Sequence, residues 1–201
     1  MFKVCGLLGP MMILALFTSG CAEQHEESPQ KETKTGYKFR KVSQEQLKSL
    51  GVKDPKKFGE SWEDPSGAVW SGIAKHDNGS LKTDDHVEAE RYCTSLGAEL
   101  PSGWPEDFNG KQGFPNHDSD FVRLRKYMGA EYAARYDTPK RYTAQILPDL
   151  LHWHWSSSVH PDFTTYAYGF NGAYGDVDLG FRKTDINYYS YRCVVPTTAR
   201  R

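Results

Sequence analysis

The stretch that decides the fold is DHVEAERYCTSLG, residues 85–97, which has the features of one complete amphipathic helix. Asp85 is a favoured N-cap residue, and Glu88 stands at the reciprocal position of a capping box. Gly97 suits the left-handed position that ends a helix. One face carries apolar residues at i, i+4 and i+7, namely Ala89, Cys93 and Leu96. The pattern predicts that Cys93 points into a core.

Other segments on both sides predict one more helix of similar length and several strands. A helix that begins at Asp118 or Ser119 would turn three apolar residues inward, namely Phe121, Leu124 and Met128. A shorter capping pattern pairs Ser43 with Gln46. Strand patterns occupy residues 68–73, 152–158, 166–170, 176–181 and 189–195. Two helices followed by antiparallel strands predict an α+β domain.

The N-terminus has the pattern of an exported lipoprotein. Residues 1–20 contain one early cation, an apolar run and small residues, which together predict a signal peptide. The apolar run is shorter than the ~20 residues that a membrane-spanning helix needs. Ser19-Gly20-Cys21 resembles the lipobox of bacterial lipoproteins, which predicts lipidation of Cys21. The alternative is ordinary cleavage nearby, which would leave Cys21 as a free thiol.

The remaining chain divides into a tether and one domain. Residues 21–36 are polar and of mixed charge, so we expect a lipidated N-terminus and a disordered tether. Residues 37–201 form the domain, with a core at about 69–195. Export, a lipid and a tether predict attachment to the cell envelope, with the outer membrane favoured over the inner because Ala22 follows the lipid site.

Cysteine usage fits an oxidising compartment. Of the four cysteines, Cys5 lies in the signal peptide and Cys21 at the lipid site, which leaves Cys93 and Cys193 as the remaining pair. Two such thiols in an exported domain are expected to form a disulfide. A metal or redox role is the alternative, and the distance between them in sequence argues against it.

Composition excludes some partners. The formal net charge is -1, so the chain sets up no field for nucleic acid or an anionic membrane surface, and nucleic acid is not expected as a partner. Aromatic residues make up 13% of the chain and compensate for few aliphatic residues, because each ring buries a large area.

The order of these motifs resembles a known family. Ala89–Pro101 (A-x-x-x-C-x-x-L-G-A-x-L-P), Trp155–Ser158 (W-S-S-S) and Tyr191–Val194 (Y-R-C-V) resemble the DUF1566 and major paralogous domain proteins of bacteria. These belong to the wider C-type-lectin-like and sulfatase-modifying-factor fold. The resemblance implies a disulfide between the first helix and the last strand, a twisted antiparallel sheet, and a core position for Trp155.

Two departures limit what the resemblance implies about function. The E-P-N, Q-P-D and W-N-D motifs of calcium-dependent lectins are absent, and the segment from Trp155 to Phe170 is short for their ligand loop. The formylglycine-generating relatives use a reactive cysteine pair near the C-terminus, whereas here one cysteine lies on a helix. Neither calcium-lectin chemistry nor that redox chemistry is therefore expected.

Polar residues of the C-terminal third could carry chemistry. His152 and His154 lie two apart on a predicted strand, so they would share a face and, with His160, could bind zinc. The alternative is a polar face opposite Trp153 and Trp155. A carboxylate pair, Asp176 and Asp178, could serve acid and base roles, although exposed carboxylates are usually only solvated. With no catalytic motif present, we expect a non-enzyme and no cofactor.

Aromatic residues in or beside turns are the better candidates for ligand contact. They are Trp104, Tyr166, Tyr168, Tyr174, Tyr188 and Tyr189, and the hairpin 166–176, including Asp176, is the predicted binding edge. The alternative is that these rings only pack. We expect a recognition or adhesion module that binds a glycan or a protein. The alternatives are a structural envelope lipoprotein and a small enzyme using the histidines and aspartates with a metal.

Overall fold

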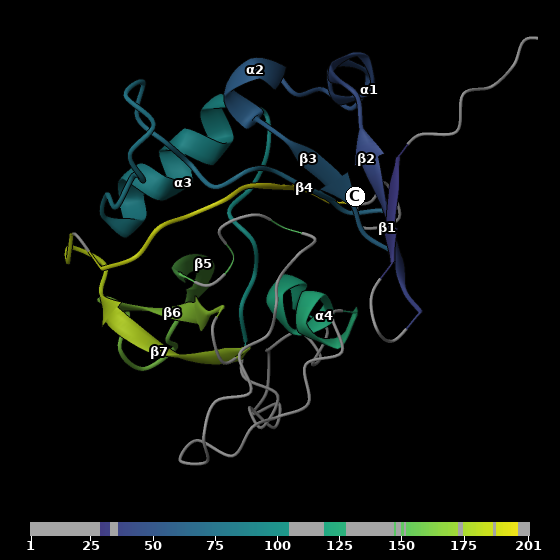
Figure 1. The fold of residues 1–201 in the computed structure, drawn as a ribbon. Helices are drawn as coiled ribbons and strands as arrows, with labels where there is room; N and C mark the ends of the chain where they lie inside the picture. Colours follow the sequence, from purple (N-terminus) through teal and green to yellow (C-terminus); the bar gives the residue numbers. More distant parts are fainter. Residues whose placement is uncertain are drawn as a thin grey trace, which may run out of the picture.

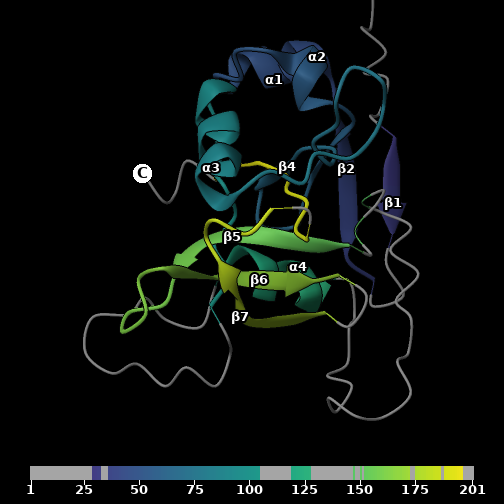
Figure 2. The ribbon, with the colours of Figure 1, turned by 90° about the vertical axis from the view of Figure 1, so that its left-hand side faces the viewer.

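The computed structural model describes residues 29–32, 36–104, 119–127, 147, 150, 152–172, 175–186 and 188–196. Within them the chain forms four helices and two antiparallel sheets. Helices α1, α2 and α3 lie on one side of the five-stranded sheet, and the three-stranded sheet with α4 lies on the other (Figures 1 and 2). The predicted α+β class is confirmed, with a short helix α1 at the predicted Ser43–Gln46 cap and a further short helix α2 in addition to the two longer ones expected.

The larger sheet brings the beginning and the end of the domain together. Its order is β1-β2-β3-β4-β8, all antiparallel, with β1 Gln30–Glu32, β2 Lys38–Val42, β3 Ser61–Glu63, β4 Val69–Trp70 and β8 Val194–Val195. Strand β4 falls within the predicted 68–73 segment. It pairs with β8 in the register Val69↔Val195, so segments that are 126 residues apart in sequence lie side by side.

Part of the expected tether belongs to this sheet. Strand β1 pairs with β2 in the register Lys31↔Phe39, and the Lys31 ammonium lies 4.3 Å from the ring centre of Trp62. The prediction of disorder over 21–36 is therefore wrong at residues 30–32. Polar residues form this strand because an edge strand needs only backbone partners on one side. Cys21 lies outside the described residues.

The smaller sheet has the order β5-β6-β7, with β5 Trp153–Val159, β6 Tyr166–Asn171 and β7 Asp176–Arg182. The expectation of one sheet is corrected to two. Between them runs the segment 190–193, whose Ser190 exchanges backbone hydrogen bonds with β5: Trp155 N–H to Ser190 O and Ser190 N–H to Trp153 O, both at 2.9 Å. The last strand is therefore shorter than predicted, because its first half joins the sheets instead of extending one.

Local signals set the helix bounds. Helix α1 (Gln44–Ser49) has the full capping box predicted from Ser43 and Gln46, and α2 (Pro55–Phe58) begins at the Asp54 cap. Helix α3 (His86–Ser95) begins at Asp85, whose carboxylate accepts from the Glu88 N–H at 2.8 Å. The Glu88 carboxylate accepts from Arg91 instead of closing the box. Helix α4 is Asp120–Tyr127, close to the prediction.

Two hydrophobic clusters hold the layers together. One lies beneath α1–α3 and includes Leu47, Phe58, Ala89, Leu96, Trp155, Tyr189 and Tyr191. The other lies between the five-stranded sheet and α4 and includes Phe39, Trp62, Trp70, Phe121, Leu124 and Phe170. The first cluster contains the Cys93–Cys193 disulfide, with a Cα–Cα distance of 5.3 Å and both residues fully buried. The predicted disulfide and the core position of Trp155 are confirmed.

Candidate functional site

A row of four aromatic rings crosses the end of the smaller sheet. Trp104 lies 5.4 Å from Tyr168, Tyr168 stacks on His160 at 5.8 Å, and His160 lies 4.8 Å from Phe163, all between ring centres. We call these four residues the aromatic row. Tyr168 within the row is buried, Trp104 at one end is half-buried, and Phe163 at the other end is 57% exposed.

The inner end of the row is fixed by hydrogen bonds around the segment 101–104. Ser102 and Asp120 bond reciprocally: the Asp120 carboxylate accepts from the Ser102 N–H (2.8 Å) and hydroxyl (2.7 Å), and the Asp120 N–H donates to the Ser102 hydroxyl (3.0 Å). Gly103 N–H donates to the Ser158 hydroxyl at 3.0 Å. A Cβ at Gly103 would lie 2.8 Å from Ser156 Cβ, so the segment fits closely on β5 only as glycine. Trp104 is thereby held against Tyr168.

The outer end is fixed by the turn between β5 and β6. His160 Nδ1 accepts from the N–H groups of Asp162 and Phe163, both at 3.1 Å. Because Nδ1 accepts two hydrogen bonds, it carries no proton, and the proton of the neutral His160 ring lies on Nε2. The Tyr166 N–H donates to Phe163 O at 2.8 Å, which closes the turn. His160 therefore shapes the turn that holds Phe163 in solvent.

A polar group lies beside the row. Arg182 Nε on β7 donates to the Tyr166 hydroxyl at 3.3 Å, and this bond raises the pKa of Arg182. The Arg182 side chain is exposed. The neighbourhood of the row thus offers flat rings, a phenol and a guanidinium.

The predicted aromatic residues separate into two groups. Trp104 and Tyr166 are half-buried and Tyr188 is 64% exposed, as the prediction of accessible rings requires. Tyr168 and Tyr189 are buried, so the prediction of exposure is wrong for these two, because β6 and the segment before β8 are each covered on the side that carries the ring. Tyr174 lies outside the described residues. Asp176 begins β7, and its side chain is likewise outside them.

Sequence reasoning missed Phe163 and the role of His160. Their signal was the turn sequence His160-Pro161-Asp162-Phe163, which precedes the aromatic strand directly. A histidine before Pro-Asp can accept from the turn's N–H groups, and an apolar residue at the turn's end has no core position to occupy.

The predicted pairing of His152 and His154 does not hold. His154 is fully buried against Phe121 and Phe170, its Nε2 lies 3.2 Å from Leu150 O, and His152 is exposed. Burial, reinforced by the positive charge of Arg192, holds the pKa of His154 well below its usual value. Among the described residues, no three His, Cys, Asp or Glu side chains gather as metal ligands would. The expectation that His154 lies on a polar face of the strand is therefore wrong.

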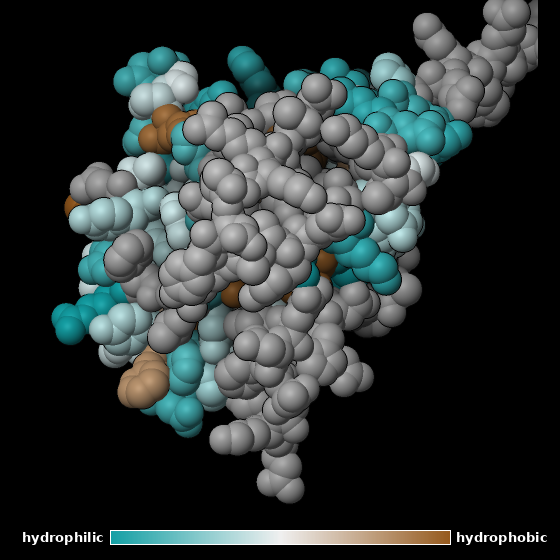
Figure 3. Space-filling view, turned by 60° about the horizontal axis from the view of Figure 1, so that its bottom comes forward, coloured by the Kyte–Doolittle hydropathy of each residue, from teal (hydrophilic) through white to brown (hydrophobic). Residues whose placement is uncertain are grey.

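Apolar side chains are scattered on the face shown in Figure 3. The described residues there are mostly hydrophilic, and the apolar atoms appear in small separate places. Over the whole described chain the exposed large hydrophobic residues are Leu50, Val87, Phe163, Ile186 and Tyr188. Phe163 is the member of this set that belongs to the aromatic row.

None of the described helices is long and apolar enough to cross a membrane. Comparisons with protein-family models, with curated proteins and with solved structures found no match for this chain.

Proposed function

We propose that this chain is a lipid-anchored recognition module of the bacterial cell envelope, with a C-type-lectin-like domain that binds a glycan through the aromatic row. Support for the fold comes from the disulfide between α3 and Cys193, next to the last strand, and from the burial of Trp155. Both are features that the resemblance implies. The signal-peptide and lipobox patterns support anchoring at Cys21, with the outer membrane as the favoured location.

The observation that carries the proposal is the exposure of Phe163 at the end of a rigid row of rings. Phe163 is 57% exposed although an apolar ring of this size is normally buried, and two hydrogen bonds to His160 hold its turn in place. A flat ring fixed in solvent offers the apolar face of a sugar a contact that loses little conformational entropy on binding. Arg182 and Tyr166 add hydrogen-bond groups for hydroxyls beside it.

A neutral glycan fits better than a polyanion. The net charge of the chain is -1, which provides no general attraction for sulfated or phosphorylated polymers. A non-catalytic role fits a site of rings, a guanidinium and a phenol, and the proposal assigns no cofactor.

The test is a glycan array probed with the purified chain, with calcium and with chelator. We expect binding that is insensitive to chelator and about ten-fold weaker after Phe163→Ala, because loss of an aromatic anchor from an interface costs ~1–2 kcal/mol. Ile186→Ala is the matched control, since Ile186 is 54% exposed, lies between β7 and β8 and is not part of the aromatic row.

Binding lost equally in both variants would place the contact elsewhere. Calcium-dependent binding would contradict the proposal that the aromatic row binds a glycan without a metal ion. An array without any bound glycan would turn the proposal toward a protein ligand or toward a purely structural envelope role.

A further inference from the structure

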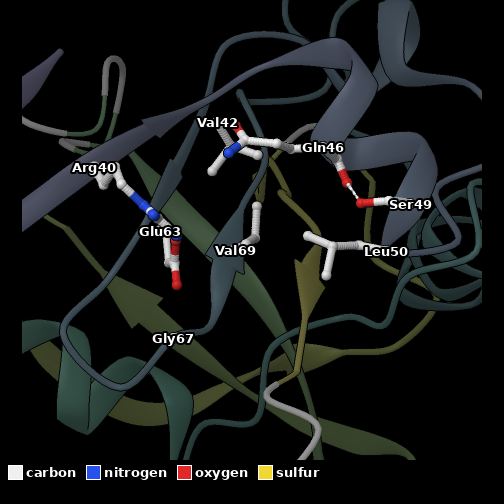
Figure 4. Close-up of a pocket in the computed structure, with 8 residues that line it drawn as sticks. All are labelled: Arg40, Val42, Gln46, Ser49, Leu50, Glu63, Gly67 and Val69. Carbon is white, nitrogen blue, oxygen red and sulfur yellow. Dashed lines mark hydrogen bonds and ion pairs between the residues drawn. The ribbon is translucent and has the colours of Figure 1, made fainter. Parts of the chain in front are cut away.

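A cleft of about 220 Å³ lies away from the aromatic row, between α1 and strands β2, β3 and β4 (Figure 4). Its apolar lining is formed by the side chains of Val42, Val69 and Leu50. Val42 and Val69 are nearly buried, and Leu50 is 38% exposed. Drug-sized ligands occupy pockets of ~300–1,000 Å³, so this cleft admits only a smaller molecule.

An ion pair lies on one side of the cleft. Arg40 on β2 and Glu63 on β3 are directly opposite in the register, and Figure 4 shows them together beside the two valines. Two of the three guanidinium nitrogens of Arg40, Nε at 2.9 Å and Nη2, donate to the same oxygen, Glu63 Oε2. Glu63 Oε1 and Arg40 Nη1 have no hydrogen-bond partner among the residues that the structure describes. At the cleft, Glu63 Oε1 can therefore accept a hydrogen bond from a ligand, and Arg40 Nη1 can donate one to it.

Polar groups of α1 also border the cleft: the Gln46 side chain extends toward Val42, and the Ser49 hydroxyl lies beside Leu50 (Figure 4). The side-chain oxygen Gln46 Oε1 accepts from the Ser43 N–H as part of the helix cap, which orients the amide. Among the residues that the structure describes, the two N–H groups of Gln46 Nε2 donate to no acceptor. The Ser49 hydroxyl donates to Gln46 O at 2.7 Å and can still accept. The cleft thus combines a charged pair, apolar side chains and neutral polar groups.

We propose that this cleft binds a small zwitterionic α-amino acid with an aliphatic side chain. The ligand's ammonium pairs with Glu63, its carboxylate pairs with Arg40, and its side chain lies on Val42, Val69 and Leu50. An ion pair carries no net charge, so a ligand that presents both signs a few ångströms apart matches it, whereas a simple anion or cation meets a like charge as well. The site is separate from the aromatic row and stands without the glycan proposal.

The test is a titration of the full purified chain with L-leucine, followed by the methyl NMR signals of Val42, Val69 and Leu50. We expect saturable shifts of these methyls with a dissociation constant on the order of 1 mM, since a molecule this small makes few contacts. N-acetyl-leucine and leucinamide each lack one of the two charges. We expect each to bind at least ~10-fold more weakly, as does L-leucine to the variants Arg40→Gln and Glu63→Gln.

The matched controls are Lys41→Gln and Glu60→Gln. Lys41 and Glu60 form an exposed ion pair at 3.4 Å close to the same strands, and neither residue lines the cleft. These variants should bind L-leucine as the wild type does. The proposal is overturned if no saturable shift of the three methyls occurs, or if the two blocked compounds bind as well as leucine. It is also overturned if the control variants weaken binding as much as the cleft variants do. The blocked compounds keep the test decisive even if a cleft variant fails to fold.

Discussion

Replacement of Gly169 by alanine tests the closest contact in the aromatic core. Gly169 lies in the middle of β6, beneath the ring of Tyr189. A Cβ at this position would lie 2.3 Å from Tyr189 Cε1, whereas carbon atoms in contact stand ~3.5 Å apart. The ring would therefore have to move by about 1.2 Å. Tyr189 is 2% exposed and stacks on Trp155 at 4.2 Å, with Trp153 at its edge, so it has no free space to enter.

The expected cost is a net loss of about 2 kcal/mol in the free energy of unfolding. Overpacking of a core costs ~1–3 kcal/mol, and the tight stack places this site near the upper end. Alanine in a strand offsets ~0.5–1 kcal/mol of that cost, because it removes the conformational freedom that glycine has in the unfolded chain. For a domain of this size the thermal midpoint should fall by roughly 4–8 °C.

Urea denaturation of a double-mutant cycle with Tyr189→Leu assigns the cost to the clash. In the leucine background the ring is gone, so we expect Gly169→Ala to cost nothing or to stabilise the fold by up to ~0.5–1 kcal/mol. Gly72→Ala is the matched control, because a Cβ there meets Glu60 backbone atoms at 3.6 Å, an ordinary contact. The reasoning is refuted if Gly169→Ala costs the same in both backgrounds, or no more than Gly72→Ala does.

Two further predictions concern the disulfide and the buried histidines. Cys93 and Cys193 are 100 residues apart, so the pair of alanine substitutions should lower the free energy of unfolding by up to about 4.7 kcal/mol in urea, and an unchanged midpoint would contradict this. Burial lowers the folded-state pKa values of His154 and His86, while the unfolded chain takes up these protons near pH 6.5. Stability should therefore be full above pH ~6.5 and decline as the pH falls toward the folded pKa values, by up to ~1.4 kcal/mol per pH unit for each histidine. Urea titrations at several pH values should show a shallower decline for His154→Phe, and a decline as steep as that of the wild type would contradict the assignment.

Features with a local cause were predictable from the sequence. The start of α3 at Asp85 and the cap of α1 at Ser43 are decided within four residues of chain, because a cap needs only a side-chain oxygen near the first free N–H groups. The disulfide was predictable by elimination, since the signal-peptide and lipobox patterns account for Cys5 and Cys21 and leave Cys93 and Cys193 as the pair.

Features that depend on distant partners were not predictable. Alternation over 152–158 indicated a strand with one polar face, yet both Trp155 and His154 are buried, because β5 has the first cluster on one face and α4 on the other. A strand covered on both faces loses its alternation of exposure. The aromatic row has the same origin: Trp104 and Tyr168 are far apart in sequence, and their contact depends on the bonds of Ser102 and Gly103 to distant residues.

The segment 190–195 joins the two sheets and α3. Ser190 bonds to β5, the Ser71 N–H donates to Cys193 O, and the Cys193 N–H donates to the Ser71 hydroxyl at 2.7 Å across 122 residues of sequence. The backbone of Val194 then pairs with both Glu99 and β4. The segment 190–195 bonds to both sheets and carries the disulfide to α3. Neither sheet can therefore complete its native contacts until this segment is in place. Such long-range closure predicts slow folding, and it explains why a domain with few aliphatic residues would depend on a covalent link at this point.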